Sequence, residues 1–229
     1  MPLLANSIAT IPVSTKYADS SRAEDGLLGL AADPGFARNG FVYMYYSPAG
    51  PQPKNVLARY HMKGNSLELA SRKILLEVGT QRDQCCHTGG SIAFDGKGNL
   101  YVSTGDNSNP FASGYAPVDE RPGRMPWDAQ KSSANTNDLR GKIIRIHPEP
   151  DGTYTIPPGN LFPPGTPKTR PEIYTMGHRN PYRIAVDPKN ADPTQTSVPL
   201  ADNGTANSGE RVEVLVQLGE QLRGQRRLR

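Results

Sequence analysis

The feature that most constrains the fold is a short unit that recurs along the chain. Each copy begins with an apolar run and turns at an Asp-Pro or Asp-Gly pair, and the first two copies continue into a β-branched and aromatic run. The copies begin at Gly26, Gly90 and Asn180, with long insertions between them. Such runs, bounded by Asp and Gly turns, predict antiparallel hairpins. Hairpins that recur with insertions are typical of a β-propeller, so we expect an all-β chain.

The first copy predicts one complete meander. Residues 26–34 and 41–47 form a hairpin, and residues 56–62 and 67–78 form a second one around a Lys-Gly-Asn-Ser turn. Ahead of them, residues 3–13 alternate well enough to predict a further strand.

The second copy carries the longest insertion. Residues 90–105 predict a hairpin, and residues 139–147 and 153–156 predict two more strands. Between them, residues 107–137 are rich in Asn, Pro, Gly and Ser, which predicts a long surface loop.

The third copy begins but is not completed. After residue 188 the partner strand is missing, residues 192–208 are polar without periodicity, and residues 210–229 show only a weak helical pattern. We therefore assign residues 1–188 to a partial β-propeller of about three blades. Residues 189–229 are expected to be a disordered or weakly helical tail, since they offer little apolar surface to bury.

Charge and hydropathy exclude some functions. The net charge is +4, and half of it lies in residues 210–229, which hold five Arg and three Glu. The body is nearly neutral, so nucleic-acid binding has no support. No run approaches the ~18 apolar residues of a membrane span. The first residues lack a signal-peptide pattern, so we expect either a cytosolic chain or a missing N-terminus. Nothing in the sequence sets an oligomeric state.

A histidine precedes the second copy. His87 is followed by Thr-Gly-Gly and lies at the mouth of a predicted strand. Histidine exchanges a proton near neutral pH, and glycines let backbone or a flat ligand approach closely. His87 is therefore a candidate general base. The alternative is a loop histidine bonded to backbone carbonyls.

The only two cysteines, Cys85 and Cys86, are adjacent. By themselves they cannot form a long-range crosslink or a zinc site. They can form a vicinal disulfide in an oxidising compartment or stay as two thiols.

Four motifs together resemble the glucose/sorbosone dehydrogenase family, the soluble quinoprotein sugar dehydrogenases. They occur in the family's order over residues 26–188. The motifs are Glu-Asp-Gly-Leu-Leu-Gly-Leu-Ala-Ala-Asp-Pro at 24–34, His-Thr-Gly-Gly at 87–90 with its continuation to residue 106, Leu-Arg-Gly-Lys-Ile-Ile-Arg-Ile at 139–146, and Gly-His-Arg-Asn-Pro at 177–181.

This resemblance implies a six-bladed propeller, periplasmic or secreted, that binds pyrroloquinoline quinone (PQQ) and calcium. It further implies oxidation of the anomeric hydroxyl of a small-molecule aldose to a lactone. By the same resemblance His87 is the general base, Arg179 and Asn180 lie at the quinone, and Glu24 takes the place of a polar residue near the site. The chain departs from the family at Cys86, where an acidic residue is common, and in its number of blades. It is therefore expected to be a fragment or a truncated member.

A second hypothesis is a noncatalytic propeller that binds carbohydrate or a protein partner, because fold alone does not decide function. Asp106, Asn107 and Asn109 offer oxygen ligands suited to calcium, although such a cluster is more often a turn. Because His87 and Arg179 precede equivalent elements of two copies, we expect both side chains at one end of the propeller axis.

Overall fold

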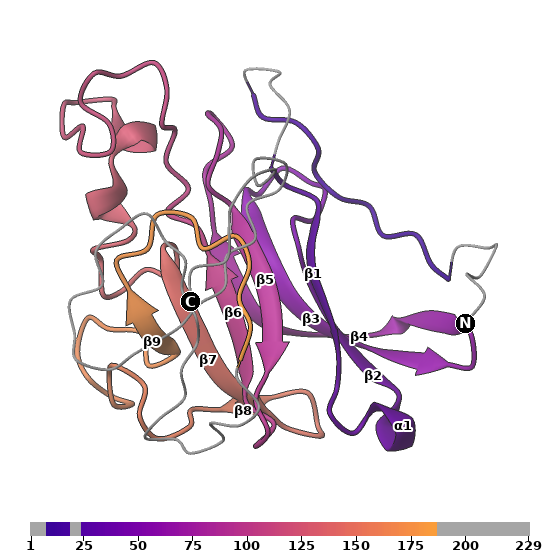
Figure 1. Ribbon diagram of the computed structural model, residues 1–229. Coiled ribbons are helices and arrows are strands. Elements are labelled where there is room, and N and C mark those ends of the chain that lie inside the picture. Colours follow the sequence, from indigo (N-terminus) through magenta and orange to yellow (C-terminus); the bar gives the residue numbers. More distant parts are fainter. Residues whose placement is uncertain (1–7, 19–23, 187–229) are drawn as a thin grey trace, which may run out of the picture.

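The computed structural model describes residues 8–18 and 24–186. The tail predicted for residues 189–229 lies outside the described residues. Two antiparallel sheets stand side by side, as expected for an all-β chain (Figure 1). They are consecutive blades of a partial β-propeller.

The first sheet is a four-stranded meander in which each strand pairs with the next along the chain. Its strands are β1 (Leu27–Ala32), β2 (Phe41–Tyr46), β3 (Lys54–Lys63) and β4 (Ser66–Gly79). Between β1 and β2 lies the single-turn helix α1 (Phe36–Asn39), which ends at Gly40 in the left-handed conformation. These bounds confirm both hairpins predicted for the first copy.

The second sheet contains five strands, of which β9 pairs with β7 on the far side from β6. Its strands are β5 (Gly89–Phe94), β6 (Leu100–Thr104), β7 (Lys142–Pro148), β8 (Tyr154–Thr155) and β9 (Ile173–Met176). The insertion between β6 and β7 contains two 3-10 turns, η1 (Met125–Trp127) and η2 (Ala129–Lys131). The strand β9 was not predicted, because four residues after a proline-rich stretch give no measurable periodicity.

The main core fills the space between the two sheets. Tyr43 and Tyr45 of β2 point into it and meet residues of the second sheet such as Val102 and Ile144. On the opposite face of β2, Met44 and its neighbours form a separate buried cluster. Because both faces of β2 are covered, its sequence is a continuous apolar run rather than an alternating one.

The far face of the second sheet is covered by the beginning of the third copy. Ile184 packs against Tyr101 of β6 and Ile143 of β7. The described part of the third copy ends at residue 186, so this extended segment is all of the third blade that the structure describes.

The predicted N-terminal strand is not formed in the part of it that the structure describes. Within residues 8–13 the only ladder contact is an isolated bridge between Val13 and Pro48. The side chains of Ile11 and Val13 nevertheless pack against the outer face of the first sheet. The alternation within residues 8–13 therefore reflects one-sided packing rather than strand pairing.

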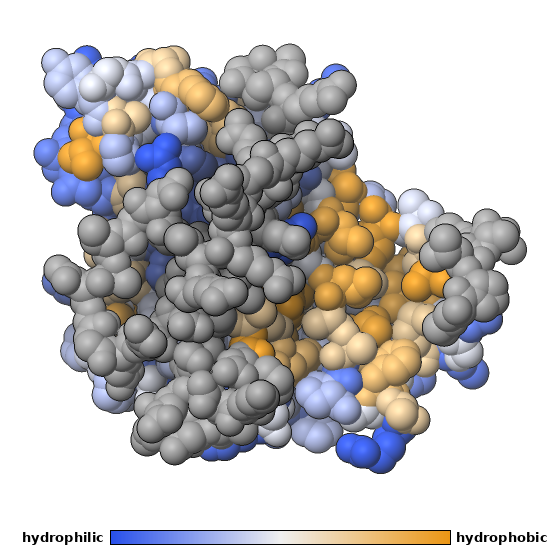
Figure 2. Space-filling model, in the orientation of Figure 1, coloured by the Kyte–Doolittle hydropathy of each residue, from blue (hydrophilic) through white to orange (hydrophobic). Residues whose placement is uncertain are grey.

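One apolar face stays partly open. Leu27 and Leu30 of β1 are 57% and 59% exposed, and their strand partners Tyr46 and Met44 lie on the same face. Figure 2 shows hydrophobic residues gathered there, over β1 and β2. In the described residues, no helix is long and apolar enough to cross a membrane.

We predict that Ile144→Ala lowers the free energy of unfolding by about 2–5 kcal/mol, because it leaves a cavity in the core that joins the two sheets. Ile144 is fully buried in that core. Urea denaturation measures the change. Leu69→Ala is the matched control, since Leu69 is 46% exposed and its truncation opens no cavity. Equal losses for the two variants would contradict this account of the core.

Candidate functional site

The site lies at one end of the second sheet, where the ends of four strands lie side by side. Gly89, Thr104, Lys142 and Met176 form one row across the sheet, because each pairs with the next. The segments just beyond this row are 87–88, 105–106, 140–141 and 177–180. Sequence-distant motifs therefore meet at one end of the blade.

Backbone bonds tie these segments together. Gly105 N donates to Thr88 O at 3.2 Å, and Gly141 N donates to Gly105 O at 2.8 Å. A β-carbon at Gly105 would collide with the carbonyl of His87. Only glycine therefore lets the strand-end segments approach this closely.

His87 is buried and bonded to a carboxylate. Its Nδ1 lies 2.8 Å from Oδ1 of Asp106, and the two residues are 8% and 2% exposed. His87 has a φ of 56°, a left-handed conformation that turns its ring inward. Because a carboxylate only accepts hydrogen bonds, Nδ1 is the donor to Asp106, and Nε2 is the ring nitrogen that this bond leaves available. The sequence also allowed a loop histidine bonded to backbone carbonyls. In the structure, the His87 ring is bonded to the Asp106 carboxylate instead.

Asp106 is held on its other side by the loop that follows it. Its Oδ1 also accepts from Ser108 N and Ser108 Oγ, both at 2.8 Å. Its Oδ2 is buried and has no hydrogen-bond partner among the described residues. From the sequence, Asp106 was a candidate only for a calcium ligand. Strand register could have indicated that Asp106 lies beside His87. Asp106 follows β6, and β6 pairs with β5, the strand that follows His87.

Arg179 and Asn180 reach the same place. Asp106 N donates to Arg179 O at 2.8 Å, and the side-chain oxygen of Asn180 lies against Gly105. That Asn180 Oδ1 is buried without a hydrogen-bond partner in the described part of the chain. Arg179 is exposed. The structure thus brings Arg179 and Asn180 beside the pair formed by His87 and Asp106.

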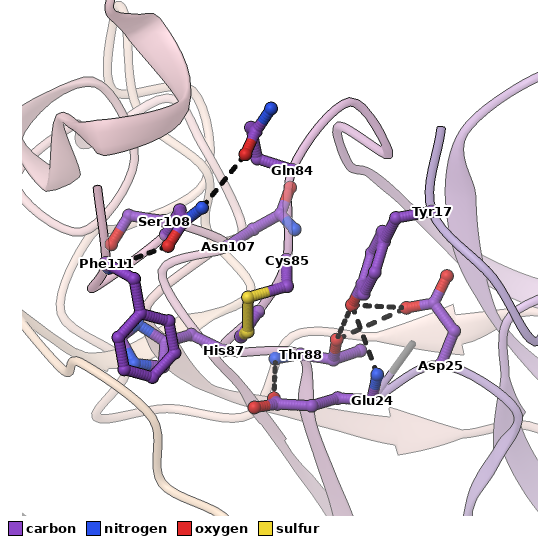
Figure 3. The surroundings of a disulfide bond; sticks show 12 residues. Tyr17, Glu24, Asp25, Gln84, Cys85, His87, Thr88, Asn107, Ser108 and Phe111 are labelled. Carbon is purple, nitrogen blue, oxygen red and sulfur yellow. Dashed lines mark hydrogen bonds between the residues drawn. A yellow bond between two sulfur atoms is a disulfide. The ribbon is translucent and has the colours of Figure 1, made fainter. Parts of the chain in front are cut away.

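Glu24 fixes the backbone next to His87. Its Oε2 accepts from Thr88 N at 3.0 Å, and its own N donates to Tyr17 Oη at 3.3 Å (Figure 3). The hydroxyl groups of Tyr17 and Thr88 lie 3.3 Å apart and both contact Asp25. Burial raises the pKa of Tyr17 to about 12. Tyr17 therefore stays a neutral hydrogen-bonding group near pH 7.

Cys85 and Cys86 are bonded to each other, and neither is a free thiol. The disulfide immediately precedes His87 (Figure 3). Of the two states left open by the sequence, the structure therefore has the vicinal disulfide.

The side chains of Asp106, Asn107 and Asn109, considered as calcium ligands, each accept a hydrogen bond from a backbone N–H. Asn107 Oδ1 accepts from Gln81 N at 2.6 Å, and Asn109 Oδ1 accepts from Phe111 N at 2.7 Å. In residues 8–18 and 24–186, no group of three or more His, Cys, Asp or Glu side chains could hold a metal ion.

The other three histidines make local contacts. His61 pairs with Glu68 at 2.9 Å, His147 Nδ1 lies 3.0 Å from Asn99 Oδ1, and His178 Nε2 lies 2.7 Å from Thr175 Oγ1. We expect each of them to be structural or exposed.

A buried lysine anchors the insertion to the sheet. Lys142 is fully buried, and its Nζ donates to the carbonyl oxygens of Ser132, Ser133 and Arg140 at 2.8–3.0 Å. Burial lowers the pKa of Lys142 to about 8. Ser132 and Arg140 also line a pocket of about 450 Å³ that reaches Asp106. Lys142 thus holds one wall of that pocket.

With fold and geometry in hand, comparison identifies the family. The family model described as Glucose / Sorbosone dehydrogenase matches residues 4–195. The chain belongs to this family. A structure described as that of an oxidoreductase (glucose dehydrogenase) from Thermus thermophilus superposes with a TM-score of 0.63 at 28% identity, covering 92% of this chain and 60% of that one.

Three curated relatives are similar over most of this chain. An uncharacterized protein of Synechocystis is 33% identical over 81% of this chain and 41% of its own length. Quinoprotein glucose dehydrogenase B of Acinetobacter calcoaceticus is 24% identical over 80% and 38%. Hedgehog-interacting protein of Homo sapiens is 25% identical over 85% and 27%. The chain thus spans less than half the length of these relatives.

We predict that stability depends on pH through Lys142. In the folded state its pKa is about 8, below the ordinary value of 10.5, so between these values the unfolded chain binds more protons. The free energy of unfolding should therefore rise with pH in this window, by roughly 2–3 kcal/mol relative to a Lys142→Met variant. Urea denaturation at several pH values measures the difference. Lys73→Met, at an exposed position, is the control, and an identical pH slope in both variants would contradict the prediction.

We predict that Cys85 and Cys86 resist alkylation when the protein is recovered from an oxidising compartment without reductant. Mass spectrometry should find no labelled thiol before reduction and two afterwards, since thiolates react and disulfides do not. Two labelled thiols in the unreduced sample would show that the bond is absent.

Proposed function

We propose that the chain is part of a quinone-dependent aldose dehydrogenase in which His87 is the general base. The observation that carries this proposal is the 2.8 Å bond between His87 Nδ1 and Asp106 Oδ1. It lies at the same strand ends as Arg179 and Asn180. Membership of the glucose/sorbosone dehydrogenase family supports the substrate class.

The pair has the properties that proton removal from a sugar hydroxyl requires. An anomeric C–H can lose hydride only as the hydroxyl proton leaves, so a base with a pKa near neutrality must reach that hydroxyl. His87 Nε2 is the acceptor that the bond to Asp106 leaves available. When Nε2 takes the proton, the buried carboxylate stabilises the imidazolium and keeps the ring oriented.

The residues beside the pair fit a planar anionic cofactor. The guanidinium of Arg179 can form a planar, bidentate contact with a carboxylate. The buried Asn180 oxygen has no described partner and would accept from a ring N–H of such a cofactor. We assign PQQ binding to Arg179 and Asn180, with Glu24 completing the set by fixing the Thr88 backbone. When bound, PQQ supplies the group that accepts hydride. Calcium enters the proposal through the resemblance alone.

We also propose that the protein acts in an oxidising compartment, as a periplasmic or secreted enzyme. The disulfide between Cys85 and Cys86 supports this, because such bonds persist outside the reducing cytosol.

A second candidate function is a noncatalytic module that binds carbohydrate or a protein partner. The similarity to Hedgehog-interacting protein, whose name describes a binding protein, favours this alternative. The two candidates differ in one respect that can be measured. Only the enzyme needs a base at His87, whereas a binding module can lose the imidazole and keep its partner.

We predict that His87→Gln lowers PQQ-dependent aldose oxidation by about 10²–10⁴-fold, the range that general-base catalysis typically contributes. The assay uses the full chain supplied with PQQ and calcium, and is repeated with a chelator. His61→Gln is the matched control, because His61 is half-exposed and its ring contacts Glu68 and Phe41 of the first sheet. Thermal unfolding monitored by circular dichroism establishes that both variants are folded.

Arg179→Lys tests the cofactor part of the same proposal. It should weaken PQQ binding, measured by fluorescence titration, because an ammonium group cannot reproduce a planar, bidentate contact. If the folded chain shows neither PQQ binding nor oxidation, the noncatalytic candidate becomes the better one.

A further inference from the structure

The segment that carries His87 also carries a disulfide that the proposed chemistry does not use. Cys85 and Cys86 immediately precede His87, and their bond lies beside it (Figure 3). Both cysteines are half-buried, so a small reductant in solution can reach the sulfur atoms. Disulfides that solvent reaches are more readily reduced than buried ones and are often regulatory. The bond is therefore a candidate for a redox-sensitive element at the edge of the site.

Hydrogen bonds anchor the segment on both sides of the cysteine pair. Before the pair, Gln84 Oε1 accepts from Asn109 Nδ2 at 3.0 Å. After the pair, Thr88 N donates to Glu24 Oε2 at 3.0 Å. Within residues 8–18 and 24–186, the backbone groups of the two cysteines form no hydrogen bond with other backbone groups. The crosslink between the sulfur atoms is therefore the main constraint on the chain between the two anchors.

His87 has a backbone conformation that needs such a constraint. Its φ of 56° lies in the left-handed region, which costs free energy for a residue with a β-carbon and persists only where the surroundings hold it. A disulfide between adjacent residues closes a small ring that includes the peptide bond joining them, so it restricts the backbone directly before His87. This restriction supports the turn that brings the ring of His87 to Asp106.

We propose that the bond between Cys85 and Cys86 is a thiol-dependent switch, which holds His87 against Asp106 when closed and releases it when opened. A dithiol reductant opens the bond by thiol–disulfide exchange. One thiolate of the reductant attacks a cysteine sulfur and breaks the S–S bond, and its second thiol then resolves the mixed disulfide. The reductant is oxidised to its own disulfide, and its two protons end on Cys85 and Cys86.

Opening the bond acts on one partner of the pair only. Asp106 stays in place, because Ser108 N and Ser108 Oγ still donate to its Oδ1. His87 is then free to leave the left-handed conformation and to move away from the carboxylate. Control of catalysis by this switch rests on the proposed function, in which His87 is the base. A chain in a reducing compartment then lacks an assembled base, and the base assembles once the chain reaches an oxidising one.

The test follows the His87 ring rather than turnover. The full chain, without PQQ, reacts with diethyl pyrocarbonate, which acylates accessible imidazoles, and peptide mass spectrometry measures the rate at each histidine. His87 should react at least about tenfold faster after treatment with dithiothreitol, because local opening exposes a residue that is otherwise 8% exposed. His61 is the matched control. It is half-exposed and pairs with Glu68 on the first sheet, so its rate should not change.

A Cys85→Ser, Cys86→Ser double variant should show the faster rate at His87 with or without dithiothreitol. Circular dichroism of the wild-type chain should show the same sheet content before and after reduction. The proposal is overturned if dithiothreitol leaves the bond closed in the folded chain, if the rate at His87 stays unchanged once both thiols are detected, or if reduction unfolds the sheets. Redox-dependent reactivity of His87 in a chain without PQQ-dependent oxidation would instead overturn the proposed function and leave the switch standing.

Discussion

The close approach of the two innermost strands, β1 and β5, is the constraint on which the rest of the structure depends. A β-carbon on Gly29 would collide with the carbonyl of Gly90, and one on Gly90 would collide with Leu28. The second glycine also has a φ of 115°, which other residues rarely adopt. The glycines in the two motifs therefore set how the blades pack, and that packing fixes where the segment carrying His87 leaves the sheet.

Most of the fold follows from local sequence. The strands β1, β2, β5 and β6 are short, largely apolar runs next to Gly, Asp or Asn, and such turn residues can be recognised without tertiary information. The strand β9 cannot be predicted in this way, because its four residues form a strand only by pairing with β7. Residues 8–13 show the converse, since their alternation comes from packing on a sheet that they do not join.

The site was only partly predictable for a related reason. His87, Arg179 and Asn180 could be named from their motifs, and their common position could be expected from the repeat. The partner of His87 could not, because the contact with Asp106 depends on the register in which Gly89 pairs with Thr104. A shift by one residue would turn the carboxylate away from the ring. Contacts that depend on strand register can be identified only in the assembled sheet.

The insertion between β6 and β7 leaves and re-enters the sheet at neighbouring points, since Thr104 pairs with Lys142 and Gly141 N bonds to Gly105 O. A segment closed at its base in this manner can change in length or composition without altering the strands that carry His87 and Asp106. The insertion and the strands that hold the His87–Asp106 bond can therefore change through separate sets of mutations. Exchange of this insertion between relatives would leave that bond in place.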